Sequence, residues 1–277
     1  GAVQPGGILN YTTKQPLMES FYDVTQQFGS YDHYRTTFDA TGAVNESKTV
    51  AFRLNGAYTN ADSFRDFVET ERWSIAPSVL WQPSEQTSVT FDFSFTDETL
   101  PYDSGVPLGF GGEFLVPVET FFGDPGLAGR NLEDLFTSVR LNHTINDVWT
   151  VRSQLQYHEI EALNESIRHR GVRGVLGAEL LRRRYQNEDR VSTGLQWVTD
   201  AVAEFEAFGA DHTAVVGVDV LDEDSDFKRF RMNLPNIAIT ANPAYGFVPP
   251  AGNASAPAFL SERFWTGVYL HDQISLL

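Results

Sequence analysis

The sequence contains no cysteine among its 277 residues. This absence excludes disulfide bridges, thiolate metal sites and a cysteine nucleophile. Basic residues are also scarce: 20 lysines and arginines stand against 37 aspartates and glutamates, and the formal net charge is −17. A chain of that charge repels the phosphates of nucleic acids, so we expect no nucleic-acid partner.

Long apolar runs are missing as well. No stretch approaches the roughly 18 to 20 consecutive apolar residues that a transmembrane helix needs. Yet 42% of the residues are hydrophobic and 13% are aromatic, which is too apolar for a disordered chain. The composition therefore excludes a helical membrane protein and predicts a folded chain of another kind.

What the sequence has instead is alternation with a period of two. The segment "SVTFDFSFTD" places Phe91, Phe93 and Phe95 on one face and Asp92 and Ser94 on the other. This pattern is typical of a β-strand with unlike faces. We expect about ten strands, with lengths near those of strands that cross a bilayer at a tilt. The candidate strands are 19–29, 32–44, 50–59, 69–81, 88–97, 137–145, 150–159, 184–198, 212–224 and 263–276.

The expected connections decide between a soluble β-sandwich and a membrane barrel. Short and long connections alternate in order along the chain, so an up-and-down meander places all the long ones on one side, as in outer-membrane barrels. Helical periodicity is confined to "DAVAEFEAF" (200–208), which we expect to be a short helical or irregular link. The short connections are 44–49, 82–87 and 145–149, and the long ones are about 60–68, 100–131, 164–184 and 225–262.

Aromatic residues near the ends of the expected strands suit the girdles of a membrane barrel. They are Tyr58, Trp73, Trp81, Trp149, Trp197 and Trp265.

Five segments, in register with the predicted strands, carry a family resemblance. "PGGILNYTTKQP" (5–16) resembles the end of the plug domain of TonB-dependent outer-membrane receptors of the ferric-siderophore class. "FYDVTQQFGSYDHYRTTFDATGAV" (21–44) is similar to the first barrel hairpin of that family, and "LPYDSGVP" (100–107) to the start of a long outer loop. The segments "HTAVVGVDV" (212–220) and "FWTGVYLHDQISL" (264–276) resemble later strands.

The resemblance implies an all-β fold: a transmembrane antiparallel up-and-down β-barrel of about 22 strands, preceded by the last strand of an N-terminal plug domain. Residues 1–16 are then the C-terminal end of the plug, and residues 17–277 the first ten or so strands. We expect an internal fragment of a protein of the outer membrane of a Gram-negative bacterium. The expected plug-end motif comprises Pro5, Gly6, Gly7, Asn10, Thr13 and Lys14.

The function implied by the resemblance is energised import without covalent chemistry. The partners would be a ferric siderophore, TonB through a missing N-terminal part, and outer-membrane lipid with lipopolysaccharide; no cofactor is expected. Aromatic faces suit the bulky body of a chelate and charged groups read its charge. The outer-loop candidates for ligand binding are Tyr102, Phe110, Phe114, Phe121, Phe122, Arg168, Arg170 and Arg173.

These residues also have alternative interpretations. Loop aromatics commonly pack a loop on itself, and the basic cluster of 164–184 commonly balances nearby acids in solvent. The ligand is alternatively cobalamin, a metal complex or a glycan, and a passive porin shares the strand pattern. A zinc hydrolase is disfavoured because "HEIEA" (158–162) lacks a second histidine, and "DEDSD" (222–226) lacks the glycine and glutamate of a calcium loop.

Overall fold

The computed structural model describes residues 13–252 and 256–276, and this part of the chain is built from β-strands and their connections. Within it, no helix is long and apolar enough to cross a membrane. The ten strands of the described residues are β1 (Phe21–Gly29), β2 (His33–Ala43), β3 (Val50–Asp62), β4 (Glu69–Ser84), β5 (Thr87–Leu100), β6 (Gly129–Thr144), β7 (Trp149–Val175), β8 (Ala178–Ala207), β9 (Ala210–Ala238) and β10 (Ala256–Leu276).

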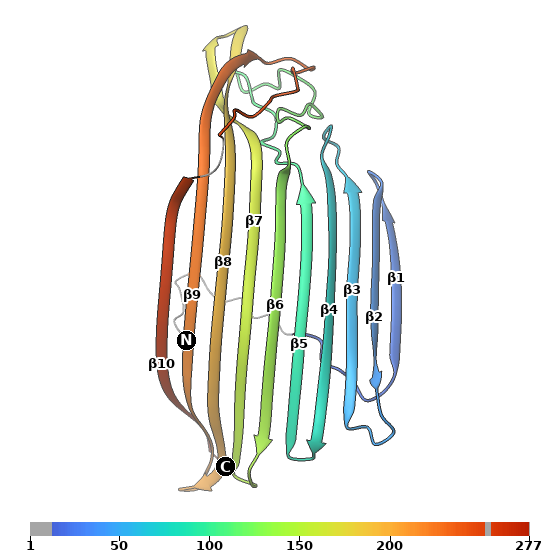
Figure 1. The fold of residues 1–277 in the computed structure, drawn as a ribbon, viewed down its shortest axis with the longest axis vertical. Helices are drawn as coiled ribbons and strands as arrows, with labels where there is room; N and C mark the ends of the chain where they lie inside the picture. Colours follow the sequence, from blue (N-terminus) through green and yellow to red (C-terminus); the bar gives the residue numbers. More distant parts are fainter. Residues whose placement is uncertain (1–12, 253–255, 277) are drawn as a thin grey trace.

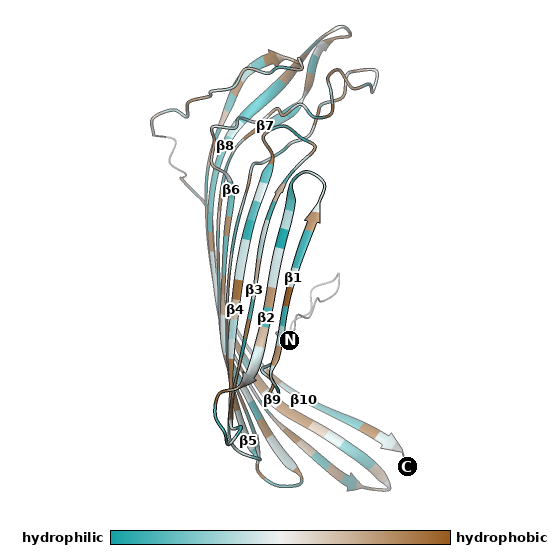
Figure 2. Cartoon of the chain, turned by 90° about the vertical axis from the view of Figure 1, so that its right-hand side faces the viewer, coloured by the Kyte–Doolittle hydropathy of each residue, from teal (hydrophilic) through white to brown (hydrophobic). Residues whose placement is uncertain are grey.

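The strands form one antiparallel sheet in which each strand pairs with its sequence neighbours (Figure 1). The order β1 to β10 follows the chain without a crossover, which confirms the predicted all-β meander. Figure 2 shows the sheet from one edge as a curved, twisted wall. Among the described residues the wall is open, because β1 and β10 each pair on one side only.

One row of paired residues crosses all ten strands and identifies the inner face of the wall. Directly opposite partners in an antiparallel sheet point to the same side. Because Asp92, in mid-row, accepts a hydrogen bond from Thr13 and shares Arg140 with Gln15, this side is the one that faces residues 13–15. The row runs through Phe21, Thr41, Arg53, Ser78, Asp92, Ser138, Gln156, Gln196, Leu221 and Trp265.

The two faces of the wall are inverted relative to a soluble protein. Asp92 on the inner face is 3% exposed and Thr41 is fully buried, whereas Trp81 and Leu155 on the other face are 51% and 47% exposed. A soluble protein hides its large apolar side chains and wets its polar ones. An outer-membrane barrel does the reverse, because hydrocarbon covers its outer face. The alternation predicted for 88–97, with its two unlike faces, is thus confirmed.

The connections are segregated between the two ends of the wall. At the lower end in Figure 1 they are short, spanning 44–49, 85–86, 145–148 and 208–209. At the upper end they include the two longest, 101–128 and the described part (239–252) of the connection between β9 and β10, together with 30–32, 63–68 and 176–177. The predicted placement of long connections on one side is confirmed, although not every upper connection is long.

Three sequence predictions about the connections are wrong. Residues 164–184 are not a loop: β7 and β8 continue through them and turn at Leu176 and Gly177. Residues 225–238 belong to β9, which shortens the expected 225–262 loop to 239–255. Of the link expected at 200–208, residues 200–207 are the end of β8, where pairing with β9 overrides the helix preference of alanine and glutamate.

The aromatic residues assigned to girdles divide between the faces. Tyr58, Trp73, Trp81, Trp149 and Trp197 are each at least 40% exposed and belong to the outer face. Trp265 pairs with Leu221 in the inner row, so its assignment to a girdle is wrong.

Candidate functional site

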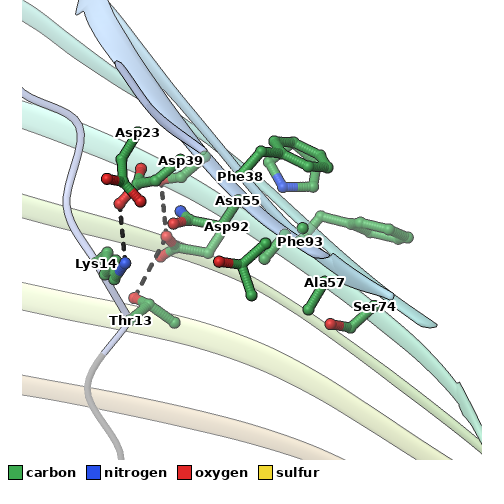
Figure 3. A pocket seen from close by; sticks show the side chains of 15 residues that line it. Thr13, Lys14, Asp23, Phe38, Asp39, Asn55, Ala57, Ser74, Asp92 and Phe93 are labelled. Carbon is green, nitrogen blue, oxygen red and sulfur yellow. Dashed lines mark hydrogen bonds and ion pairs between the residues drawn. The ribbon is translucent and has the colours of Figure 1, made fainter. Parts of the chain in front are cut away.

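Residues 13–17, which we call the linker, are bound to the inner face of the wall (Figure 3). Lys14 Nζ lies 2.8 Å from Asp39 Oδ2. Arg53 donates to both oxygens of the same carboxylate, at 2.9 and 2.7 Å, and a third time to the carbonyl of Gln15 at 2.8 Å. The side chains of Asp39 and Arg53 are only 9% and 12% exposed. Such a bidentate, charge-assisted pair fixes the linker in place against β2 and β3.

A second carboxylate, Asp92, anchors the linker from β5. Its oxygens accept hydrogen bonds from Ser78 at 2.8 Å, Arg140 at 2.8 Å and Ser138 at 3.3 Å. Arg140 also donates to the side-chain oxygen of Gln15 at 3.0 Å. The linker is therefore held by side chains of four strands, and the buried charges are paired as burial requires.

Next to these ion pairs, a cavity of about 400 Å³ lies between the linker and the inner face of β1 to β5. Lys14, Asp23, Asp39 and Asp92 are among the residues that line it (Figure 3). Because the linker itself forms one side, this cavity belongs to linker docking and lies away from the upper loops.

Four of the predicted plug-end residues, Pro5, Gly6, Gly7 and Asn10, lie outside the described residues. The remaining two are part of the network: Lys14 pairs with Asp39, and Thr13 Oγ1 lies 3.5 Å from Asp92 Oδ1. The sequence did not single out the carboxylates that receive them. The only sequence signal for these carboxylates is that each is an acidic residue at an inward-facing position of a strand.

Two of the five aromatic loop candidates are buried. Phe121 and Phe122 are 1% and 2% exposed. Phe122 forms a small apolar core with Val116 of the same connection and Leu181 of β8. These two phenylalanines therefore shape the 101–128 connection from inside.

The other three aromatic candidates are accessible or bound to an arginine. Phe110 and Phe114 are 52% and 63% exposed. The guanidinium carbon of Arg168 lies 4.0 Å from the centroid of the Tyr102 ring, within cation–π range. The structure thus brings Tyr102 of the 101–128 connection together with Arg168 of β7.

The upper connections are tied to one another by polar contacts. Arg65, in the 63–68 connection, pairs with Asp103 Oδ2 at 2.8 Å and donates to the carbonyls of Val118 and Thr120. Its side chain is 9% exposed. Since a buried guanidinium without partners is costly, these contacts fix the 101–128 connection against its neighbour.

Tyr245 links the 239–255 connection to the same assembly. Its hydroxyl donates to the carbonyl of Phe121 at 2.9 Å, and its ring centroid lies 5.2 Å from that of Phe67. Burial raises the pKa of Tyr245, and the nearby carboxylates of Asp66 and Asp124 raise it further. The phenol therefore stays protonated and able to donate.

The basic candidates differ in their surroundings. Arg168 is partly buried and lies 3.3 Å from Glu188 of β8, whereas Arg170 and Arg173 are exposed. Sequence reasoning missed Arg229 and Arg231 on β9, which pair with Glu188 and Gln186 of β8, just beyond Arg184. Their spacing of two residues, which places both on one strand face, was the available clue.

The two sequences considered as metal motifs are strand residues. Residues 158–162 lie in β7 and residues 222–226 in β9. In the described part of the chain, no three His, Asp and Glu side chains are grouped so that they could hold a metal ion.

Comparison with known families gives one match over most of the wall. The family model described as "TonB dependent receptor-like, beta-barrel" matches residues 73–277. Similar curated proteins include the ferrioxamine receptor of Yersinia enterocolitica, 28% identical over 98% of this chain and 39% of the relative. The ferrichrome outer membrane transporter/phage receptor of Escherichia coli K12 is 25% identical over 99% of this chain and 40% of the relative. The chain thus spans about two fifths of the length of these relatives.

Solved structures show the same fold. The closed form of the ferric-catecholate import receptor Fiu of E. coli aligns with a TM-score of 0.83 and 19% identity, over 96% of this chain and 40% of that one. The ferric preacinetobactin receptor BauA of Acinetobacter baumannii aligns with a TM-score of 0.80 and 16% identity, over 96% and 40%. At such identities the likeness supports the architecture alone.

Proposed function

Because this chain belongs to the family of TonB-dependent receptor-like β-barrels, we propose that the protein is an outer-membrane receptor that binds a ferric siderophore and imports it with energy supplied through TonB. The observation that carries the proposal is the inverted wall. Polar side chains such as Asp92 and Ser138 are buried on the inner face, while tryptophans and leucines are exposed on the outer one. This arrangement suits a wall between hydrocarbon and a polar lumen.

The substrate class is inferred from the relatives. Their names specify ferrioxamine, ferrichrome and metal-pseudopaline as ligands, all bound by receptors that resemble this chain. Because one of these ligands is metal-pseudopaline, metal complexes other than iron chelates must be included among the candidate substrates.

In this proposal residues 1–16 are the end of the plug domain, and residues 17–277 are the first ten strands of the barrel. Lys14 and Gln15 make the contacts expected where a plug joins its barrel, with Asp39, Arg53 and Arg140. These bonds would hold the plug by its C-terminal end while force acts on the rest of it.

The ligand would be captured at the upper end of the wall. Tyr102, Phe110 and Phe114 offer aromatic faces, and Arg168, Arg170 and Arg173 offer positive charge. Phe121 and Phe122 would act from inside the loop by keeping its shape, since their rings are already enclosed.

Ligand binding to the purified full-length receptor tests this assignment. Deletion of 105–125 should weaken binding of the ferric chelate while the barrel still assembles, as judged by heat-modifiable migration. The milder variant F110S/F114S leaves the buried core of the loop intact. Its control is Phe205→Ser, an exposed phenylalanine of β8 far from the upper loops. Unchanged binding by the assembled deletion variant would remove the loop from the site.

A further inference from the structure

A second feature of the inner face is a concentration of arginines on its upper part. Arg168 of β7 pairs directly with Arg184 of β8. Arg190 of β8, and Arg229 and Arg231 of β9, belong to the same face, because each lies an even number of residues from the inner row on an unbroken part of its strand. The upper parts of these strands carry hydrophilic colours in Figure 2.

These five arginines (Arg168, Arg184, Arg190, Arg229 and Arg231) form a cluster whose positive charges are poorly compensated by the chain itself. Of the carboxylates in the described residues, only Glu188 forms ion pairs with the cluster, at 3.3 Å from Arg168 and 3.4 Å from Arg231. Arg190 and Arg229 instead lie over the ring of Phe227, at 4.9 and 5.4 Å. Within a chain that holds 37 acidic residues against 20 basic ones, this is a local reversal of charge.

Two hydrogen-bond donors in and beside the cluster have no partner in the described part of the chain, which also favours an anion as the ligand. Gln186 is fully buried, and its oxygen accepts from Arg231 at 3.0 Å and from Arg184 at 3.4 Å. Its Nε2 and the Nε of Arg184 are buried without a hydrogen-bond partner among the described residues. Buried donors without partners are costly, as are like charges directly opposite in a sheet. An anion at this place would relieve both costs.

There is also space beside the cluster. A cavity of about 440 Å³ is lined by Arg170, Arg182, Arg183, Arg184 and two asparagines, without any carboxylate. Its size is within the range of small-molecule sites, roughly 300–1,000 Å³. Tyr102, stacked on Arg168, adds an aromatic face at the border of the cluster.

We propose that the transported ligand is an anionic ferric chelate and that Arg168, Arg184, Arg229 and Arg231 recognise its negative charge on the way into the lumen. This inference rests on the proposed function and narrows its substrate class. The inner-face position favours a soluble chelate over a lipid headgroup, because the outer face is the one that meets lipid. Glu188 acts as an internal counter-ion that the ligand displaces from the arginines.

The test compares two ferric chelates on the full-length receptor in detergent: an anionic tris-catecholate and a neutral tris-hydroxamate. R229Q/R231Q should weaken binding of the anionic chelate about ten- to a hundredfold. It should also make the remaining affinity less dependent on salt concentration, because fewer charges contribute to binding. Glu188→Gln should act in the opposite direction and tighten it. R229K/R231K retains the charge and should keep most of the affinity.

Arg152→Gln is the matched control, an inner-face arginine of lower β7 paired with Asp200 at 2.7 Å, and it should leave affinity unchanged. Each variant must show the heat-modifiable migration of an assembled barrel. If R229Q/R231Q does not assemble, Glu188→Gln decides alone, through its predicted gain of affinity.

The outcomes separate this inference from the function on which it rests. Preference for the neutral chelate, with no effect of the arginine or glutamate variants, would leave a siderophore receptor and overturn the anionic substrate. The arginines would then serve contacts within the receptor itself. Binding of neither chelate would overturn the recognition of this anionic chelate by the arginines, and failure to bind any member of a wider siderophore panel would overturn the proposed function as well.

Discussion

Replacing Arg53 by glutamine should destabilise the receptor by removing the main partner of a buried carboxylate. The substitution deletes both bonds to Asp39, at 2.9 and 2.7 Å, and the bond to the carbonyl of Gln15. Breaking a buried ion pair at one partner costs about 3–5 kcal/mol. We expect about 3 kcal/mol, the low end, because Lys14 continues to pair with Asp39 from its more exposed position.

A double-mutant cycle with Asp39→Asn isolates the pair. The free energy of unfolding is measured by urea titration of the full-length receptor in lipid vesicles. The double variant should cost less than the sum of the single variants by about 1.5 kcal/mol or more. Arg35→Gln is the control, since this arginine donates to the neutral hydroxyl of Thr59 at 2.8 Å. A coupling energy near zero would refute the role of the ion pair.

Three further predictions concern other contacts. Thr41→Val leaves two backbone groups without their buried hydroxyl partner and should cost about 1–3 kcal/mol in the same titration. Phe122→Ala should cost about 3–5 kcal/mol of local packing and expose 101–128 to protease, without loss of the assembled barrel. Tyr245 has its pKa raised above 10.0 in the folded protein, mainly by burial and also by Asp66 and Asp124, so its contribution is complete below pH 10 and is lost as the pH rises through the higher folded value. Tyr245→Phe should abolish this alkaline loss of loop order. The order of the loop is measured as the rate of protease cleavage within 239–255 at increasing pH. An alkaline loss that persists in the variant would contradict the role of the Tyr245 hydroxyl.

The membrane-crossing parts of the strands were predictable because two different solvents act on their two faces. In β5, hydrocarbon-facing Phe91 and Phe93 alternate with inward Asp92 and Ser94, and the structure keeps this division. In upper β7 and β8 that contrast is lost. Arg183 and Arg184 are adjacent in sequence and lie on opposite faces of β8, yet both are charged. The sequence therefore shows no period of two here, and this is why a loop was predicted where the structure has a hairpin.

The site was predictable as a set of residue types but not as a set of positions. Aromatic residues in 101–128 could be found from composition. The burial of Phe122 depends on Leu181, which is distant in sequence, and no local pattern separates Phe122 from the exposed Phe114. The linker network joins residues from four strands by hydrogen bonds, and such a convergence leaves no trace in any single segment.

Import is tested most directly by uptake of radiolabelled iron, presented on a panel of siderophores, into iron-starved cells that carry or lack the full-length gene, with and without a proton-motive-force uncoupler. The proposed function predicts uptake from at least one chelate that requires both the gene and the energised membrane. Gene-dependent entry that persists with the uncoupler would contradict energised transport and indicate a passive pore. Uptake independent of the gene for every chelate would contradict the siderophore assignment.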